Sequence, residues 1–260
     1  MSAGKPRPFD RRSLVFLAAT FAITWIAWGS LIVFKDIAPG TVPFVALHLI
    51  GGFGPTVAPF IAFAAMGKDE RRDFLARVLR WKVNAGWYLI ATALVAACGA
   101  GYYLYGRPQL QPWYLIFPMF LAMVIGGGLE ELGWRGLLLD ALIREGRSKL
   151  LAGLGVGAVW ALWHLPLFYI EGVNQYGRSF LFFAVGVLGC SLMLTVLYAA
   201  TRSVVLAVFF HALLNASYGM GLMPGPEDAK GAALQGVLLL GLGAAAMAAD
   251  LVLSKRRRGG

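Results

Sequence analysis

Long apolar runs separated by short polar segments set the pattern of this sequence. Each run, as a helix, is long enough to cross a hydrocarbon core of about 30 Å. Backbone polar groups must be satisfied internally in lipid, and no alternating strands of barrel type are visible, so we expect helices. The pattern predicts an all-α polytopic membrane protein with about eight transmembrane helices, at 13–34, 42–66, 86–106, 112–142, 150–170, 180–200, 203–222 and 231–253.

Composition and charge support an integral membrane protein. Of the 260 residues, 59% are hydrophobic and 14% are charged, whereas about a quarter of a soluble domain is charged. The mean hydropathy is +0.70. The net charge of +10 comes from short clusters between apolar runs. These clusters lack the interleaved aromatic residues of a nucleic-acid surface, so no nucleic-acid partner is expected.

Basic residues also predict the orientation of the chain. With the N-terminus inside, eighteen of the 23 Lys and Arg residues fall in inner segments and four in outer loops. This excess is the positive-inside signal, and it places both termini in the cytoplasm. The short tails and the Ala-, Gly- and Arg-rich composition are typical of bacteria. The predicted location is therefore a bacterial cytoplasmic membrane.

The whole chain, 1–260, is expected to form a single transmembrane domain. Glycines and prolines within 51–59 favour close packing or a kink in the second run. Cys98 and Cys190 lie in apolar runs and are expected to be free, buried thiols. The predicted parts are a cytoplasmic tail at 1–12, an amphipathic helix at the inner interface at 67–82, catalytic core motifs at 125–215, and a basic cytoplasmic tail at 254–260.

Three ionisable residues lie well inside the fourth run, where a charge costs roughly 3 kcal/mol on insertion scales. Glu130 and Glu131 are adjacent, and Arg135 follows Glu131 by four residues, which lets the two pair on one helix face. Charges at this depth are tolerated where they face a polar cavity, so the default inference is a functional site. The Glu131–Arg135 pair would then support the site by holding the helix in position.

Two of the three histidines also lie within apolar runs. His164 falls in the fifth run, and His211 shares a helix face with Asn215 in the seventh. Counting about 1.5 Å per residue from the inner helix ends puts these residues and Glu130 at similar depth, nearer the cytoplasmic side. His48, close to the outer end of the second run, is expected to be structural or interfacial.

Together these polar residues match the needs of peptide hydrolysis around an intramembrane cavity. A carboxylate in a low-dielectric pocket becomes a better base, so Glu130 is the candidate to activate water. His164 can share the water and pass on its proton. His211 and Asn215 are candidates to donate to the developing oxyanion.

Other interpretations of the same residues remain open. Buried pairs of this kind can simply hold helices together. The set can also bind Zn²⁺, with Glu130, His164 and His211 as ligands, although the usual His-Glu-x-x-His motif is missing. Water activation by glutamate without metal is the favoured mechanism, since no Ser or Cys nucleophile motif is present. A proton-coupled transporter and a non-catalytic membrane scaffold are the alternative functions.

Three short motifs follow one another in the middle of the chain. Glu130-Glu131-Leu-Gly-Trp-Arg135 matches Glu-Glu-x-x-x-Arg, Trp160-x-x-x-His164 resembles Phe-x-x-x-His, and His211-x-x-x-Asn215 matches His-x-x-x-Asn. In this order they resemble the signature of the CAAX protease and bacteriocin-processing family (CPBP, or Abi), which includes the type II CAAX prenyl endopeptidases. The resemblance covers roughly residues 45–220. Trp160 is the one departure and is expected to change the shape of the pocket while catalysis survives.

The resemblance implies eight spans around a conical cavity open to the cytosol and the bilayer. It implies that the residue matching Glu130 activates water with His164, and that those matching His211 and Asn215 stabilise the oxyanion. The family has also been called metalloprotease. Prenyl endopeptidases remove the last three residues of a prenylated CAAX sequence, but bacteria generally lack protein prenylation. The expected partners are therefore a membrane-associated or lipidated peptide, cleaved near its C-terminus, and membrane lipids.

Overall fold

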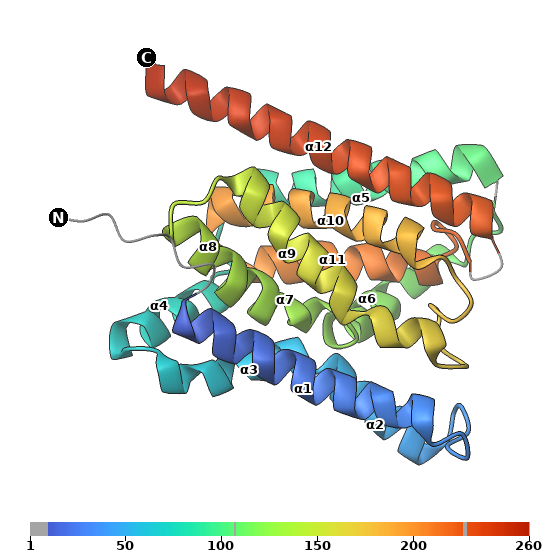
Figure 1. Ribbon diagram of the computed structural model, residues 1–260. Coiled ribbons are helices and arrows are strands. Elements are labelled where there is room, and N and C mark those ends of the chain that lie inside the picture. Colours follow the sequence, from blue (N-terminus) through green and yellow to red (C-terminus); the bar gives the residue numbers. More distant parts are fainter. Residues whose placement is uncertain (1–9, 107, 226–227, 260) are drawn as a thin grey trace.

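The computed structural model describes residues 10–106, 108–225 and 228–259, and every regular element in them is a helix (Figure 1). The predicted all-α class is confirmed. In chain order the elements are α1 (Arg11–Val33), α2 (Val42–Gly52), α3 (Gly54–Ala62), η1 (Phe63–Ala65), α4 (Lys68–Val78), α5 (Ala85–Gly106), η2 (Trp113–Leu115), α6 (Ile116–Ile125), η3 (Gly128–Glu130), α7 (Glu131–Gly133), η4 (Trp134–Leu139), α8 (Asp140–Arg144), α9 (Lys149–Trp163), η5 (Leu165–Tyr169), α10 (Phe180–Thr201), α11 (Val204–Gly219) and α12 (Ala229–Gly259).

The predicted count of eight spans is not confirmed. The segments 42–52 and 54–65 are bent by 48° relative to each other, in the stretch where a kink was predicted, and count as one broken span at most. α11 has only 16 residues, because the chain turns away at Gly221 with a φ of 75°. Among the described residues six helices are long and apolar enough to cross a membrane, or seven with the bent pair: Arg11–Val33, Ala85–Gly106, Trp113–Arg144, Lys149–Tyr169, Phe180–Thr201 and Ala229–Arg256.

α1 shows how the bundle is adapted to lipid. Its first turn is capped by Asp10, whose carboxylate accepts a hydrogen bond of 2.8 Å from the Ser13 backbone N–H. Thr20 and Thr24 are fully buried, whereas Ile26 is 71% exposed. Thr24 donates from its hydroxyl to the Gly51 carbonyl at 2.7 Å. Polar side chains of α1 therefore turn toward the helix bundle, and its outer side carries apolar side chains such as Ile26, as expected for an integral membrane protein.

The helices run between two opposite faces of the bundle (Figure 1). We call one the termini face; it carries the start of α1, α4, and the ends of α8 and α12. We call the other the loop face; it carries the connections 34–41, 170–179 and 220–225. Each candidate residue can therefore be placed relative to these two faces.

The two ends of the chain, predicted as cytoplasmic tails at 1–12 and 254–260, are described only in part. Of the tail predicted at 1–12, residues 1–9 lie outside the described part, and α1 begins at Arg11. The segment 254–260, predicted as a tail, continues α12 as far as Gly259, and residue 260 lies outside the described part.

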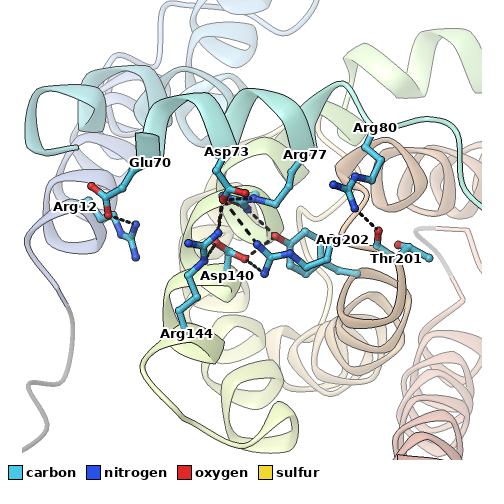
Figure 2. A network of polar contacts seen from close by, with 11 residues as sticks. Arg12, Glu70, Asp73, Arg77, Arg80, Asp140, Arg144, Thr201 and Arg202 are labelled. Carbon is cyan, nitrogen blue, oxygen red and sulfur yellow. Dashed lines mark hydrogen bonds and ion pairs between the residues drawn. The ribbon is translucent and has the colours of Figure 1, made fainter. Parts of the chain in front are cut away.

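A network of charged side chains fastens α4 to the rest of the termini face (Figure 2). The Asp140 carboxylate, at the start of α8, pairs with Arg202 at 2.6 Å and with Arg77 of α4 at 3.1 Å. The Tyr198 hydroxyl also donates to Asp140, at 2.9 Å. Asp73 of α4 pairs with Arg77 at 3.0 Å. α4, which falls within the segment predicted as an interfacial helix, is thus bonded to α8 and α10.

The span that carries the two glutamates is not a regular helix. α6 ends at Ile125, and the glycines 126–128 lead into the 3₁₀ turn η3. Glu130 closes that turn, and the π-helical segment η4 follows soon after with Arg135 in it. Isolated π-helical turns are frequent at functional sites, because the extra residue redirects side chains locally. This irregularity sets the direction of the ionisable residues.

Candidate active site

A cavity of about 690 Å³ reaches into the bundle from the loop face. Glu130, His164, His211 and Asn215 all line it. They come from η3, from the end of α9 and from α11, which are separate segments of the chain. The structure therefore brings together the four residues for which the sequence predicted chemistry.

The mouth of the cavity lies among the exposed residues Gly172, Asn174 and Ser179 of the loop face. His164 directly follows the last residue of α9, because a 3₁₀ turn replaces the helix there, and Asn215 lies four residues before the end of α11. His164 and Asn215 thus lie nearer the loop face, whereas Glu130 and His211 lie near the middle of their spans.

Trp160 contacts most of the candidate residues. Its indole Nε1–H donates to Glu130 Oε2 at 2.9 Å, and its carbonyl oxygen bonds His164 Nδ1 at 2.8 Å. Its ring meets the His211 ring edge-on, with centroids 5.1 Å apart. The Arg135 guanidinium lies over the same ring at 4.6 Å. Trp160, predicted only to shape the pocket, instead holds a carboxylate and a histidine directly.

Hydrogen bonds at Nδ1 determine the tautomers of the two histidines. A carbonyl oxygen only accepts, so the bond to Trp160 assigns the hydrogen to His164 Nδ1. Likewise His211 Nδ1 donates to Glu131 Oε1 at 2.8 Å. Each neutral ring then has its lone pair on Nε2. In both histidines Nε2 is the atom left for chemistry.

Glu131 is fully buried and joins two of the predicted residues. The predicted pairing with Arg135 is confirmed, at 3.0 Å. The bond from Glu131 to His211 was not predicted, and the two residues are 80 positions apart in the chain. A carboxylate that holds the far nitrogen of a functional histidine fixes its ring orientation.

Gly127 permits the close approach of α11 to the start of η3. A Cβ atom at this position would lie 2.5 Å from Asn215 Nδ2 and 3.5 Å from His211 Nε2. The Asn215 amide has no hydrogen-bond partner among the described residues and is therefore free to donate into the cavity. Sequence reasoning missed Gly127, although three successive glycines beside a buried glutamate were a visible signal.

Comparison with known proteins agrees with this arrangement. Residues 111–217, which contain all three motifs, match the family described as type II CAAX prenyl endopeptidase Rce1-like. This segment of the chain is similar to the Rce1-like family. It is also 25% identical over 224 residues to CAAX prenyl protease 2 of Methanococcus maripaludis, an alignment that covers 77% of this chain and 82% of that protein. The predicted resemblance is confirmed, and with it a peptidase that acts on peptide or protein substrates.

A metal site in this chain would need several donor side chains within reach of one ion. Within residues 10–106, 108–225 and 228–259, no three His, Cys, Asp or Glu side chains gather closely enough to hold a metal ion. In the structure, the alternative ligand set of Glu130, His164 and His211 is therefore not gathered around one ion position.

The residues expected to be structural behave as packing groups. His48 also lines the cavity, and its ring is stacked with those of Trp28 and Phe44 at 6.1 and 6.2 Å between centroids. Cys98 and Cys190 are free and buried, as predicted.

Proposed function

We propose that this chain is an intramembrane endopeptidase that cleaves membrane-associated or lipidated peptides near their C-terminus, using a water activated by Glu130. The observation that carries the proposal is the convergence of Glu130, His164, His211 and Asn215 on one cavity. Glu130 is the only carboxylate among the described residues that line it, and it is 8% exposed. A base in this position is shielded from bulk water and open to the cavity.

Attack on the peptide begins at Glu130. The carboxylate takes one proton from a water, whose oxygen forms a bond to the carbonyl carbon of the scissile peptide. The Trp160 indole holds Glu130 Oε2 and so orients the carboxylate. The lone pair on His164 Nε2 accepts the second hydrogen of the water and fixes its direction. The two groups thus place the nucleophile before reaction.

Negative charge then collects on the former carbonyl oxygen. The free N–H groups of Asn215 donate to it. His211 Nε2 donates when it carries a second proton, and the charge of that imidazolium ion is balanced by Glu131 at Nδ1. Loss of one oxyanion donor typically lowers kcat by about 10²–10³. Protonated Glu130 finally gives its proton to the amine nitrogen as the C–N bond breaks, which regenerates the carboxylate.

The cavity wall suits a substrate held at the membrane. Apolar and aromatic side chains, among them Trp163, Phe183 and Leu214, surround the polar groups. The relative from Methanococcus maripaludis is named a CAAX prenyl protease. We infer that a lipid attached to the substrate, or the apolar part of a membrane peptide, packs against these side chains. Membrane lipids would be further partners of the protein.

We also propose a bacterial cytoplasmic membrane with both termini in the cytoplasm. Eighteen of the 23 basic residues fall in segments that this orientation puts inside. The cavity lining includes exposed residues of the opposite, loop face, among them Gly172, Asn174 and Ser179. Cytoplasmic termini and the cytosolic opening implied by the resemblance therefore cannot both hold. On the charge argument, the mouth faces the outer side and receives peptide segments presented there.

A fluorogenic lipidated peptide and purified protein test the proposed chemistry. Glu130→Gln and His164→Ala should each lower kcat by about 10²–10⁴, the range of general acid–base catalysis. Glu145→Gln, an exposed carboxylate at the termini face, is the matched control and should leave kcat unchanged. Thermal unfolding shows whether each variant is folded. Retained turnover in both cavity variants would refute the proposal.

We further propose that the reaction needs no metal. Turnover should persist after treatment with 1,10-phenanthroline and dialysis. Loss of turnover that added Zn²⁺ restores would contradict this.

A further inference from the structure

Two polar side chains in the cavity wall lack partners. Gln235 of α12 is 2% exposed, and neither its amide nitrogen nor its amide oxygen has a hydrogen-bond partner among the described residues. Arg178, in the loop before α10, has a buried Nε atom that is also without a partner there. Leaving a buried polar group unpaired costs free energy, because the group has lost its water and gained no partner. Two such groups in one cavity wall indicate a place built for a ligand.

Arg178 is distinguished by its charge. It is the only Lys or Arg among the described residues that line the cavity, and no Asp or Glu in that part of the chain pairs with it. Burial lowers the pKa of Arg178 from its ordinary value, because desolvation disfavours the charged guanidinium and no carboxylate offsets this effect. The buried Arg77 and Arg135, by contrast, each pair with a carboxylate. An unpaired guanidinium suits a planar, two-oxygen anion.

The start of α10 adds to the attraction for an anion. Ser179 precedes the first residue of this 22-residue helix and makes no side-chain cap, so the first-turn N–H groups remain open. Gln235 lies beside the same helix end. A Cβ atom on its neighbour Gly236 would be 2.6 Å from the Phe182 carbonyl oxygen. The guanidinium, the amide and the helix end therefore occupy one region of the cavity wall.

We propose that Arg178, with Gln235 beside it, binds the free C-terminal carboxylate of the peptide substrate. This rests on the proposed function, because it places the carboxylate in the cavity that holds Glu130. The Arg178 guanidinium pairs with the carboxylate, and the Gln235 amide bonds either the carboxylate or the last peptide group. The fixed separation between Arg178 and Glu130 then sets how many residues lie beyond the cleaved bond. The position of the cleaved bond is therefore determined by its distance from the C-terminus of the substrate.

Matched peptides with a C-terminal acid or a C-terminal amide test this in nanodiscs of neutral lipid. The wild type should have the lower KM for the acid. Arg178→Gln should raise KM for the acid about tenfold to a hundredfold, with little change in kcat or in KM for the amide. Arg178→Lys should recover part of the preference. Lys230→Gln, an exposed cation of the same face, is the control and should change neither value.

Two outcomes would overturn the proposal. One is an equal effect of Arg178→Gln on acid and amide, or no effect on either. The other concerns a lipid phosphate, which offers similar anionic chemistry. In that case anionic lipid would change turnover only when Arg178 is present, and Arg178→Gln would still prefer the acid peptide. This result would assign Arg178 to a lipid headgroup.

Binding measurements separate this proposal from the proposed reaction. Fluorescence anisotropy of labelled acid and amide peptides is measured with the Glu130→Gln variant, in which no turnover is required. Acid-selective binding that Arg178→Gln abolishes supports the carboxylate site even if the wild type shows no peptidase activity. Turnover without any acid selectivity supports the peptidase and rejects the carboxylate site.

Discussion

Trp160 stands where the motif that this sequence resembles has Phe, and its indole adds a hydrogen-bond donor to the candidate site. The motif usually has Phe at this position, and a Phe ring can fill the same space. Only Trp adds the Nε1–H that donates to Glu130. A hydrogen bond to a charged group contributes about 1.5–3 kcal/mol. The indole is therefore a positioning group for the proposed base.

Trp160→Phe should lower kcat about tenfold while the protein stays folded, because Glu130 loses the donor that orients it. Steady-state kinetics on the fluorogenic peptide measure this. Trp25→Phe is the matched control: its Nε1 bonds the Trp163 carbonyl, it lies outside the cavity, and kcat should not change. An unchanged kcat in Trp160→Phe would show that the bond does not orient the base.

Gly127→Ala should lower kcat by tenfold or more, since the added methyl group would lie 2.5 Å from Asn215 Nδ2 and must displace the amide. Gly155→Ala is the control, because a Cβ there meets nothing within 4 Å. The comparison of kcat and thermal stability separates displacement of the oxyanion donor from general destabilisation. Equal activity of both variants would contradict the placement of Asn215.

At the scale of elements, charge pairs fasten α4 to the bundle. Asp140 accepts from the Tyr198 hydroxyl and pairs with Arg77, Arg144 and Arg202 (Figure 2). Arg77 is 4% exposed, so it depends on these partners for its burial. Removal of one partner of a buried pair is more costly than the pair's net contribution, because the other charge stays buried.

Asp140→Asn should destabilise the protein by about 3 kcal/mol, or roughly 5–10 °C in Tm. Asp69→Asn, an exposed acidic residue of α4, should have almost no effect and is the control. Thermal unfolding in detergent measures both. A Tm for Asp140→Asn within about 1–2 °C of wild type would contradict the role of the network.

Asp73 makes part of this fastening depend on pH. Burial alone would raise the pKa of Asp73, but the guanidinium groups of Arg77, Arg144 and Arg202 lower it below its ordinary value. A carboxylate with a lowered folded-state pKa contributes stability above its unfolded pKa of about 3.9 and loses it as the pH falls further. The Tm difference between wild type and Asp73→Asn should therefore shrink below about pH 4. A constant difference from about pH 6 to pH 3 would contradict this.

The whole molecule has a basic face and, opposite it, a face with a cavity. Its orientation in the membrane decides which compartment supplies the substrate. Asn174 lies at the mouth and is exposed, while Lys255 lies near the end of α12 at the other face. Both native cysteines are buried, which favours a low labelling background.

In intact cells, Asn174→Cys should react with a membrane-impermeant maleimide, whereas Lys255→Cys should react only after permeabilisation. This follows from the excess of basic residues on the side of the termini. The inverse labelling pattern would place the mouth in the cytoplasm and show that the charge argument is wrong.

The sequence alone determined the helical class, the membrane environment and the positions of the polar groups. These follow from local physics: an apolar run needs no partner to prefer a helix in lipid, and a charge inside such a run is conspicuous because it is costly. Glu130, His164, His211 and Asn215 therefore stand out in the sequence itself. Their convergence was only an expectation from matching depths.

Tertiary structure decided which atoms meet and where the cavity opens. The bond between Glu131 and His211 joins residues 80 positions apart, and that between Trp160 and Glu130 joins residues 30 apart. The span count changed because Gly221 ends α11 early and a bend breaks the second run. The role proposed for Arg178 depends on the absence of a carboxylate partner among the described residues. Each of these depends on how helices pack, which the periodicity of one segment does not encode.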